Sequence, residues 1–151
     1  MSVANLFDVE LTVDEDEPPG YGARYARVGP IVGSEQLVLL VYELPPGLSI
    51  CPYHYENAEE EWLIVLTGRP TLRTPDGERE LERWDCAFFP TGEEGAHKVT
   101  NRTDETVRVC IWSNRLAVAT SVYPDSEKVG AWPPGKLFRL ADAVDYFTGE
   151  A

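Results

Sequence analysis

Residues 54–68, HYENAEEEWLIVLTG, join a histidine, a run of carboxylates and a short apolar segment that stops at a glycine. The apolar part, Trp62–Thr67, has the length of one β-strand. Side chains two positions apart lie on the same face of an extended chain, so His54 and Glu56 are expected to point the same way. Glu61 comes directly before the apolar run. The stretch therefore predicts a strand with imidazole and carboxylate side chains near its start.

A second stretch, FFPTGEEGAHKVTN at residues 88–101, contains the other histidine of the chain, His97. Gly92 and Gly95 allow tight bends, after which His97 begins a new strand. His54 and His97 are the only two histidines in the sequence. Each histidine lies at the edge of a strand-like segment, the first beside carboxylates and the second beside glycines.

Short apolar segments separated by glycine and proline recur along the whole chain, which contains 12 residues of each. Such punctuation is typical of an all-β sandwich or barrel with little helix. Pro75-Asp76-Gly77 predicts a hairpin turn, since Asp and Gly tolerate positive φ. The strands that we expect are Gln36–Leu44, Trp62–Thr67, Pro70–Thr74, Glu78–Leu81, Cys86–Phe89, Val107–Ser113 and Leu116–Tyr123.

The two ends of the chain give weaker patterns. We expect an edge strand within Tyr25–Gly33 and, from apolar residues at helical spacing, a short helix or coil over Leu137–Phe147 that covers one side of the sheet. The predicted organisation is an N-terminal arm and edge strand at 1–34, a β-barrel at 35–124, and a C-terminal extension packing on the barrel at 125–151.

The length of 151 residues suits one domain with a buried core. Acidic residues outnumber basic ones 26 to 13, giving a net charge of −13 that repels nucleic acid and anionic lipid. The longest apolar run, Leu37–Tyr42, is too short to cross a bilayer, and the N-terminus lacks the pattern of a secretory signal. The charge thus predicts no nucleic-acid or membrane partner, and three widely spaced cysteines indicate reduced thiols in a cytoplasmic protein.

The two stretches resemble the paired motifs of the cupin superfamily, which folds as a double-stranded β-helix, a small jelly-roll-like barrel. The first motif corresponds here to Gly47, His54-x-Glu56, Glu61 and Gly68, and the second to Trp84, Pro90-x-Gly92, His97 and Asn101. The phrases FPTGEEGAH and VYPDSEKVG also resemble a group of small bacterial cupins. Trp84 stands where the family usually has glycine, which predicts a different turn before Asp85.

The resemblance implies a divalent metal ion held by His54, Glu56, Glu61 and His97. Glu56 departs from the family, which usually has histidine there. Imidazoles suit zinc or nickel, and the added carboxylates favour harder ions such as iron(II) or manganese(II). If Glu56 turned outward, His54, Glu61 and His97 would still form a facial triad with open positions. A barrel that has lost its metal and keeps the histidines in hydrogen bonds is the remaining alternative.

The resemblance also implies a homodimer and a small-molecule ligand. The function that we expect is a metal-dependent enzyme of the oxygenase or isomerase type. The alternative is a non-catalytic cupin that binds a sugar or metabolite, with or without metal. Cys51 lies three residues before His54, and strand alternation predicts that it faces the other way as buried filler.

Overall fold

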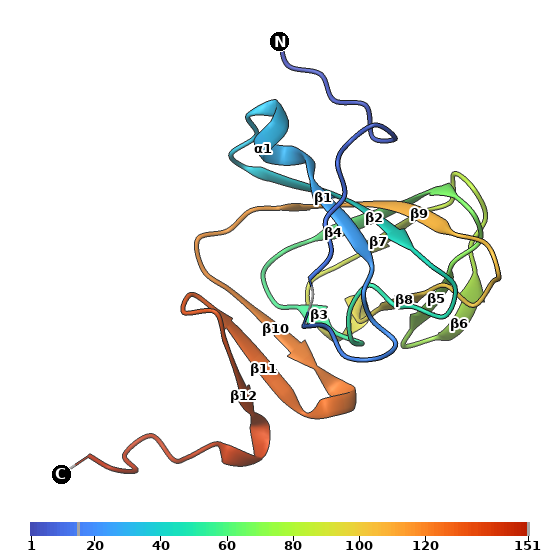
Figure 1. The fold of residues 1–151 in the computed structure, drawn as a ribbon. Helices are drawn as coiled ribbons and strands as arrows, with labels where there is room; N and C mark the ends of the chain where they lie inside the picture. The colour runs from blue at the N-terminus through green and yellow to red at the C-terminus, as the bar shows by residue number, and fades with distance from the viewer. Residues whose placement is uncertain (15, 151) are drawn as a thin grey trace.

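Antiparallel β-strands make up almost all of the regular structure (Figure 1). The computed structural model describes residues 1–14 and 16–150. The strands are β1 (Arg24–Arg27), β2 (Leu37–Leu44), β3 (Tyr55–Glu56), β4 (Glu61–Thr67), β5 (Thr71–Thr74), β6 (Gly77–Glu80), β7 (Cys86–Phe89), β8 (Lys98–Thr100), β9 (Val107–Asn114), β10 (Ala119–Tyr123), β11 (Lys128–Trp132) and β12 (Lys136–Arg139). One α-helix, α1 (Val28–Val32), and three 3-10 turns, η1 (Glu93–Gly95), η2 (Pro124–Ser126) and η3 (Leu140–Asp142), complete the fold. The predicted all-β class with little helix is confirmed.

The strands form a five-stranded sheet in the order β1-β2-β9-β4-β7, a three-stranded sheet β6-β5-β8 and a four-stranded sheet β12-β11-β10-β3. Every pairing within them is antiparallel. Alternation along β4 and β9 turns Leu63, Val65, Val109 and Ile111 inward, where they join the buried core. Val99 reaches the same core from β8, so the sheets enclose one apolar interior.

The outer face of the five-stranded sheet is apolar as well. Trp62 on β4 lies directly opposite Trp112 on β9, and the two indoles stack with ring centroids 6.0 Å apart. The ring of Phe88 on β7 lies 4.8 Å from that of Trp62. Trp62 and Phe88 remain 39% and 43% exposed. A sheet with apolar side chains on both faces needs a cover on each, and this aromatic patch of Trp62, Phe88 and Trp112 lacks a complete one.

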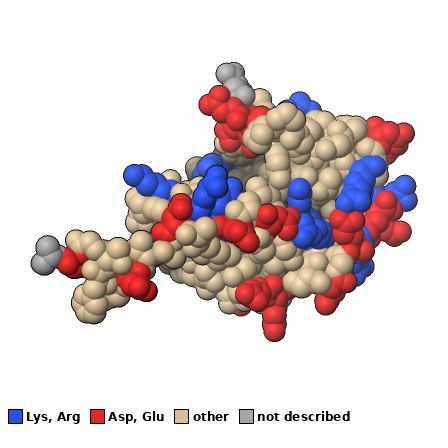
Figure 2. All heavy atoms as spheres, turned by 90° about the horizontal axis from the view of Figure 1, so that it is seen from below, with Lys and Arg blue, Asp and Glu red and all other residues tan. Residues whose placement is uncertain are grey.

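Basic side chains on the barrel surface lie next to acidic ones, as Figure 2 shows for one face. Glu43 on β2 pairs with Arg24 on β1 and, at 2.5 Å, with Arg108 on β9. Arg73 on β5 donates two hydrogen bonds of 2.6 and 2.9 Å to Asp125 in η2. These ion pairs tie neighbouring strands together and locally balance the excess of carboxylates.

The short helix or coil expected over Leu137–Phe147 begins with a strand instead. The first residues of the segment form β12, which pairs with β11 from Lys128↔Arg139 to Ala131↔Lys136, and only η3 follows as a single turn. The open edge of β11 supplies backbone partners that outweigh a weak helical spacing. The side chains of residues 136–150 are exposed. The three consecutive strands β10, β11 and β12, called the C-terminal hairpin below, extend away from the barrel (Figure 1).

The structure also refines the expectations for the N-terminal edge strand and for the turn at Trp84. The predicted edge strand is present as β1, at the end of the five-stranded sheet, but it stops at Arg27 and α1 follows. Trp84 has φ = 73°, in the left-handed region that favours glycine. The backbone therefore keeps a turn suited to glycine, and the tryptophan side chain adapts to it, 61% exposed and beside Arg83.

Among residues 1–14 and 16–150, no helix has the length and apolar character needed to cross a membrane. The homodimer stays a prediction, and the aromatic patch is the surface that we expect it to use.

We predict that the parent protein has a mass near twice the 16.9 kDa of one chain by light scattering. Trp62→Glu places a charge at the centre of the aromatic patch and should shift the mass toward one chain, because burying an unpaired carboxylate is costly. Phe138→Glu is the matched control, since Phe138 is 50% exposed on the separate β12. A parent mass near 16.9 kDa would refute the dimer.

Candidate metal centre

The backbones of His54 and His97 are bonded directly to each other. The two residues form an isolated antiparallel bridge, with His54 N–H donating to His97 O at 3.1 Å and His97 N–H donating to His54 O at 2.8 Å. Directly opposed residues of such a pair project to the same face. The imidazole rings therefore lie side by side, with centroids 4.8 Å apart.

The bend before His97 depends on glycine. At Gly95 a β-carbon would lie 1.8 Å from the carbonyl oxygen of Pro90, so no larger residue fits without moving the backbone. Gly92 has φ = 84° and its N–H donates to the carbonyl of Glu56 at 2.7 Å. This bond joins the second motif to the first and brings His97 beside His54.

Hydrogen bonds fix the tautomer of each imidazole. Nδ1 of His54 lies 3.0 Å from the carbonyl oxygen of Pro52, and Nδ1 of His97 lies 2.9 Å from that of Gly95. A carbonyl can only accept, so both Nδ1 atoms carry the proton and both Nε2 atoms keep a lone pair. Histidine ligands of metals are oriented by the same kind of bond.

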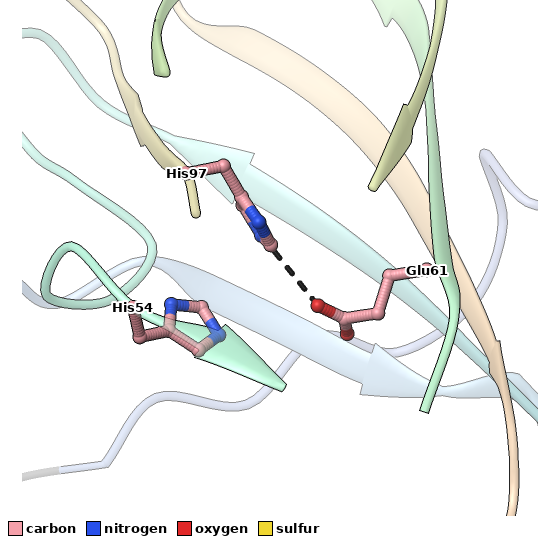
Figure 3. Close-up of side chains that lie close together, drawn as sticks. All are labelled: His54, Glu61 and His97. Carbon is pink, nitrogen blue, oxygen red and sulfur yellow. Dashed lines mark ion pairs between the residues drawn. The ribbon is translucent and has the colours of Figure 1, made fainter. Parts of the chain in front are cut away.

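Glu61 brings a carboxylate to the two rings from the first position of β4 (Figure 3). Its Oε2 lies 3.6 Å from Nε2 of His97. One donor atom each from His54, Glu61 and His97 lies within 4.8 Å of the other two. Donors that share one ion at about 2.1 Å are roughly 3–4 Å apart, so small side-chain shifts would complete a site.

Glu56 lies beside this cluster of three and does not turn outward. Its Oε1 is 3.7 Å from Nε2 of His54, and its side chain is 13% exposed. Its other oxygen, Oε2, accepts a hydrogen bond of 2.9 Å from the hydroxyl of Ser121 on β10. The structure thus converges His54, Glu61 and His97 and holds Glu56 on the His54 side of them.

Aromatic rings and burial set the charge states of the site. The ring of Phe89 stacks on His97 at 3.7 Å, and Tyr123 stacks on His54 at 5.8 Å. Burial lowers the pKa of His97 to about 3, with the nearby His54 adding to the effect, and burial also lowers the pKa of His54. Both imidazoles are therefore neutral near pH 7, the form that binds metal.

Burial acts on the two carboxyl groups in the opposite sense. It raises the pKa of Glu61 to about 7, with the neighbouring Glu56 and Glu59 adding to the effect. It also raises the pKa of Glu56, against which the Ser121 hydrogen bond works. Two neutral imidazoles beside two desolvated carboxyl groups form a donor set that lacks positive charge. The residues present therefore fit a divalent cation, which would stabilise the ionised carboxylates.

Sequence reasoning placed Cys51 on the wrong side. Its Sγ lies 3.5 Å from Nδ1 of His54, and burial raises the pKa of this thiol to about 12. Residues 50–53 form bends, not a strand, so alternation does not apply there. Tyr42 and Tyr123 were also missed; burial raises the pKa of each, so both hydroxyls stay protonated near the site.

Comparison with known proteins agrees with this architecture. The model of the Cupin domain family matches residues 40–114, which include all four candidate ligands. The chain belongs to the cupin superfamily. No curated protein shows a significant sequence match to this cupin.

Several solved structures share the fold. A protein from Acidithiobacillus ferrooxidans, provisionally named a sugar phosphate isomerase, is 24% identical, with 92% of this chain and 90% of that one covered and a TM-score of 0.83. A sugar phosphate isomerase of the cupin superfamily from Silicibacter pomeroyi is 24% identical, with 92% and 93% covered and a TM-score of 0.82. A Cupin 2 conserved barrel domain protein from Salinispora arenicola is 24% identical, with 78% and 91% covered and a TM-score of 0.60.

The extent of these matches differs in an informative way. The first two structures match 92% of this chain. The unmatched residues are too few to make up the whole segment before residue 40 or the whole segment after residue 114. The two longer matches therefore share at least part of the N-terminal arm and of the C-terminal hairpin with this cupin, beyond the family's common barrel.

We predict that Glu61→Gln stabilises the metal-free protein at pH 8. With a pKa of about 7 in the folded state, Glu61 lowers stability as pH rises from its unfolded value near 4.5 to 7, and the cost persists above pH 7. The neutral amide removes this cost and can donate to Nε2 of His97. Relief of roughly 1–3 kcal/mol corresponds to a melting temperature higher by about 2–12 °C.

The gain should shrink toward pH 5, and added divalent metal should stabilise the parent more than the variant. Thermal melts with chelator and with metal, at pH 5 and pH 8, measure both effects. A lower melting temperature for metal-free Glu61→Gln at pH 8 would show that the carboxylate serves structure instead.

Proposed function

We propose that this cupin binds a divalent metal ion through His54, Glu61, His97 and Glu56, and acts as an isomerase on a small hydroxylated molecule of the sugar phosphate class. The observation that carries the proposal is the convergence of two Nε2 lone pairs and the Glu61 carboxylate in one buried place. Two imidazoles with carboxylates suit iron(II), manganese(II), zinc or nickel.

A bound cation would supply Lewis-acid polarisation of a substrate carbonyl or hydroxyl oxygen. Neighbouring aromatic residues would exclude water from the site and donate hydrogen bonds to the substrate. Phe89 and Tyr123 stack on the histidines and exclude water from their faces. Burial keeps the hydroxyls of Tyr42 and Tyr123 protonated, so each can donate a hydrogen bond to substrate oxygen. A molecule with several hydroxyl or carbonyl groups would accept such hydrogen bonds.

The isomerase class is supported by the names of the two solved structures that match both flanks of the barrel. Isomerisation of a sugar moves a proton between neighbouring carbons and needs no oxidant, in keeping with a site of metal ligands and neutral donors. The oxygenase type, which the sequence also led us to expect, would consume oxygen, and an oxygen-uptake measurement on the same substrates would detect this.

A second candidate is a cupin that binds a sugar or metabolite without turnover. Three groups near the four candidate ligands are Cys51, Tyr42 and Tyr123, and burial holds all three in neutral form. None of these three accepts a proton near pH 7, so the nearby proton acceptors are carboxylates, and a metal ion bound to Glu56 and Glu61 would favour binding over catalysis. Turnover of a sugar phosphate distinguishes the two candidates.

Elemental analysis of protein purified without added metal or chelator tests the metal. We expect about one divalent ion per chain in the parent, as for a site with one set of ligands. His97→Ala should weaken binding by more than the roughly 10–100-fold that follows loss of a ligand's outer partner. Glu56→His restores the usual cupin ligand and should keep or raise affinity for zinc or nickel.

Competition titrations on the parent and both variants give these affinities, and an aldose–ketose interconversion assay with a panel of sugar phosphates tests the reaction. If the parent binds no divalent ion at micromolar concentration while Glu56→His does, the metal-dependent function is wrong. If the metal is bound but no panel member is converted, the binding candidate is favoured.

A further inference from the structure

A chain of two hydrogen bonds leads from the C-terminal hairpin to Glu56. Nε1 of Trp132 on β11 donates to Oγ of Ser121 on β10 at 3.0 Å, and Oγ of Ser121 donates to Oε2 of Glu56 at 2.9 Å. The indole N–H can only donate, so the serine oxygen accepts there and its own proton points to the carboxylate. The direction of the chain is thereby fixed.

The strand register builds this arrangement. Ser121 lies opposite Glu56 in the β10–β3 pairing, and it is 3% exposed. On its other side β10 pairs with β11, with Ala119 opposite Trp132. Asn57 adds a backbone and a side-chain bond to Thr120, at 2.9 Å each, which holds β3 against β10.

The bond to Ser121 makes the two oxygens of Glu56 unequal, because it occupies one lone pair of Oε2. Oε2 is engaged by the hydroxyl, whereas Oε1 faces Nε2 of His54 at 3.7 Å. That separation is close to the 3.6 Å between Glu61 and His97. A carboxylate with both oxygens free can bind an ion through two atoms, and one that is held in this way presents a single atom, as a histidine does.

We propose that Trp132 and Ser121 are positioning residues that make Glu56 a one-oxygen ligand on the His54 side of the metal. The C-terminal hairpin is then part of the metal centre, although it lies outside the barrel residues 40–114. The inference rests on the proposed metal-binding function, and it explains how glutamate replaces the usual histidine without loss of the site.

Ser121→Ala, Ser121→Cys and Trp132→Phe test the proposal in the full chain, with Zn²⁺ affinity measured by competition against a chromophoric chelator. Ser121→Ala should weaken Zn²⁺ binding roughly tenfold, as expected for loss of a ligand's hydrogen-bond partner. Ser121→Cys keeps the size of the side chain but donates poorly, so it should behave like alanine. Trp132→Phe should weaken binding less, since the hydroxyl remains.

Rescue and coupling separate positioning from a structural role. Ser121→Thr keeps the hydroxyl that Ser121→Ala lacks, so it should bind Zn²⁺ with most of the parent's affinity. The absorption spectrum of bound Co²⁺ should differ from that of the parent in Ser121→Ala but not in Ser121→Thr. In a Glu56→Ala background, Ser121→Ala should have no further effect on Zn²⁺ affinity. Trp112→Phe, on the outer face of the sheet, is the control for removing an indole.

The proposal is overturned if Ser121→Ala and Trp132→Phe bind Zn²⁺ as the parent does, or if Ser121→Ala weakens binding equally with and without Glu56. Because Trp132 is 38% exposed, Trp132→Phe tests the chain of bonds even if a change at the buried Ser121 prevents folding. A parent that binds no metal overturns the proposed function as well, whereas normal binding in these variants overturns the positioning alone.

Discussion

The antiparallel bridge between His54 and His97 is the constraint on which the site depends. Its two backbone hydrogen bonds join segments that are 43 residues apart in sequence, and they leave the imidazoles side by side. Two features of the barrel position the histidines for this contact. The Gly92–Gly95 bend places His97 beside His54, and the β3–β10 pairing holds the strand that follows His54. Carbonyls that accept from both Nδ1 atoms then direct the Nε2 lone pairs inward.

The same arrangement lowers the stability of the metal-free protein, which is expected of a site that binds a cation. Neutral imidazoles next to desolvated carboxyl groups add little to the stability of a barrel, because within residues 1–14 and 16–150 neither Glu56 nor Glu61 forms an ion pair with Lys or Arg. The core of Leu63, Val65, Val107 and Val109 supplies the stability that allows such a site. A divalent cation would reverse the balance, so metal binding and folding should be linked in this cupin.

The sequence predicted the barrel strands well because alternation and glycine–proline punctuation are local signals, and β2, β4, β7 and β9 lie where these signals placed them. The resemblance to the cupin motifs named four candidate ligands, and the structure brings His54, Glu61 and His97 together with Glu56 beside His54. Prediction from the sequence failed where partners come from far along the chain. The pairing of β12 with β11 replaced the first part of an expected short helix or coil, and neither the Ser121–Glu56 bond nor the position of Cys51 follows from local spacing.

The central claim is that the two histidines and the carboxylates bind one metal ion through Nε2 and oxygen atoms. X-ray absorption spectroscopy at the edge of the metal retained after purification without chelator tests it most directly. We predict nitrogen and oxygen donors at about 2.0–2.2 Å and the outer scattering of two imidazole rings. A protein without metal, or a sulfur donor near 2.3 Å from Cys51 in place of an imidazole, would contradict the account.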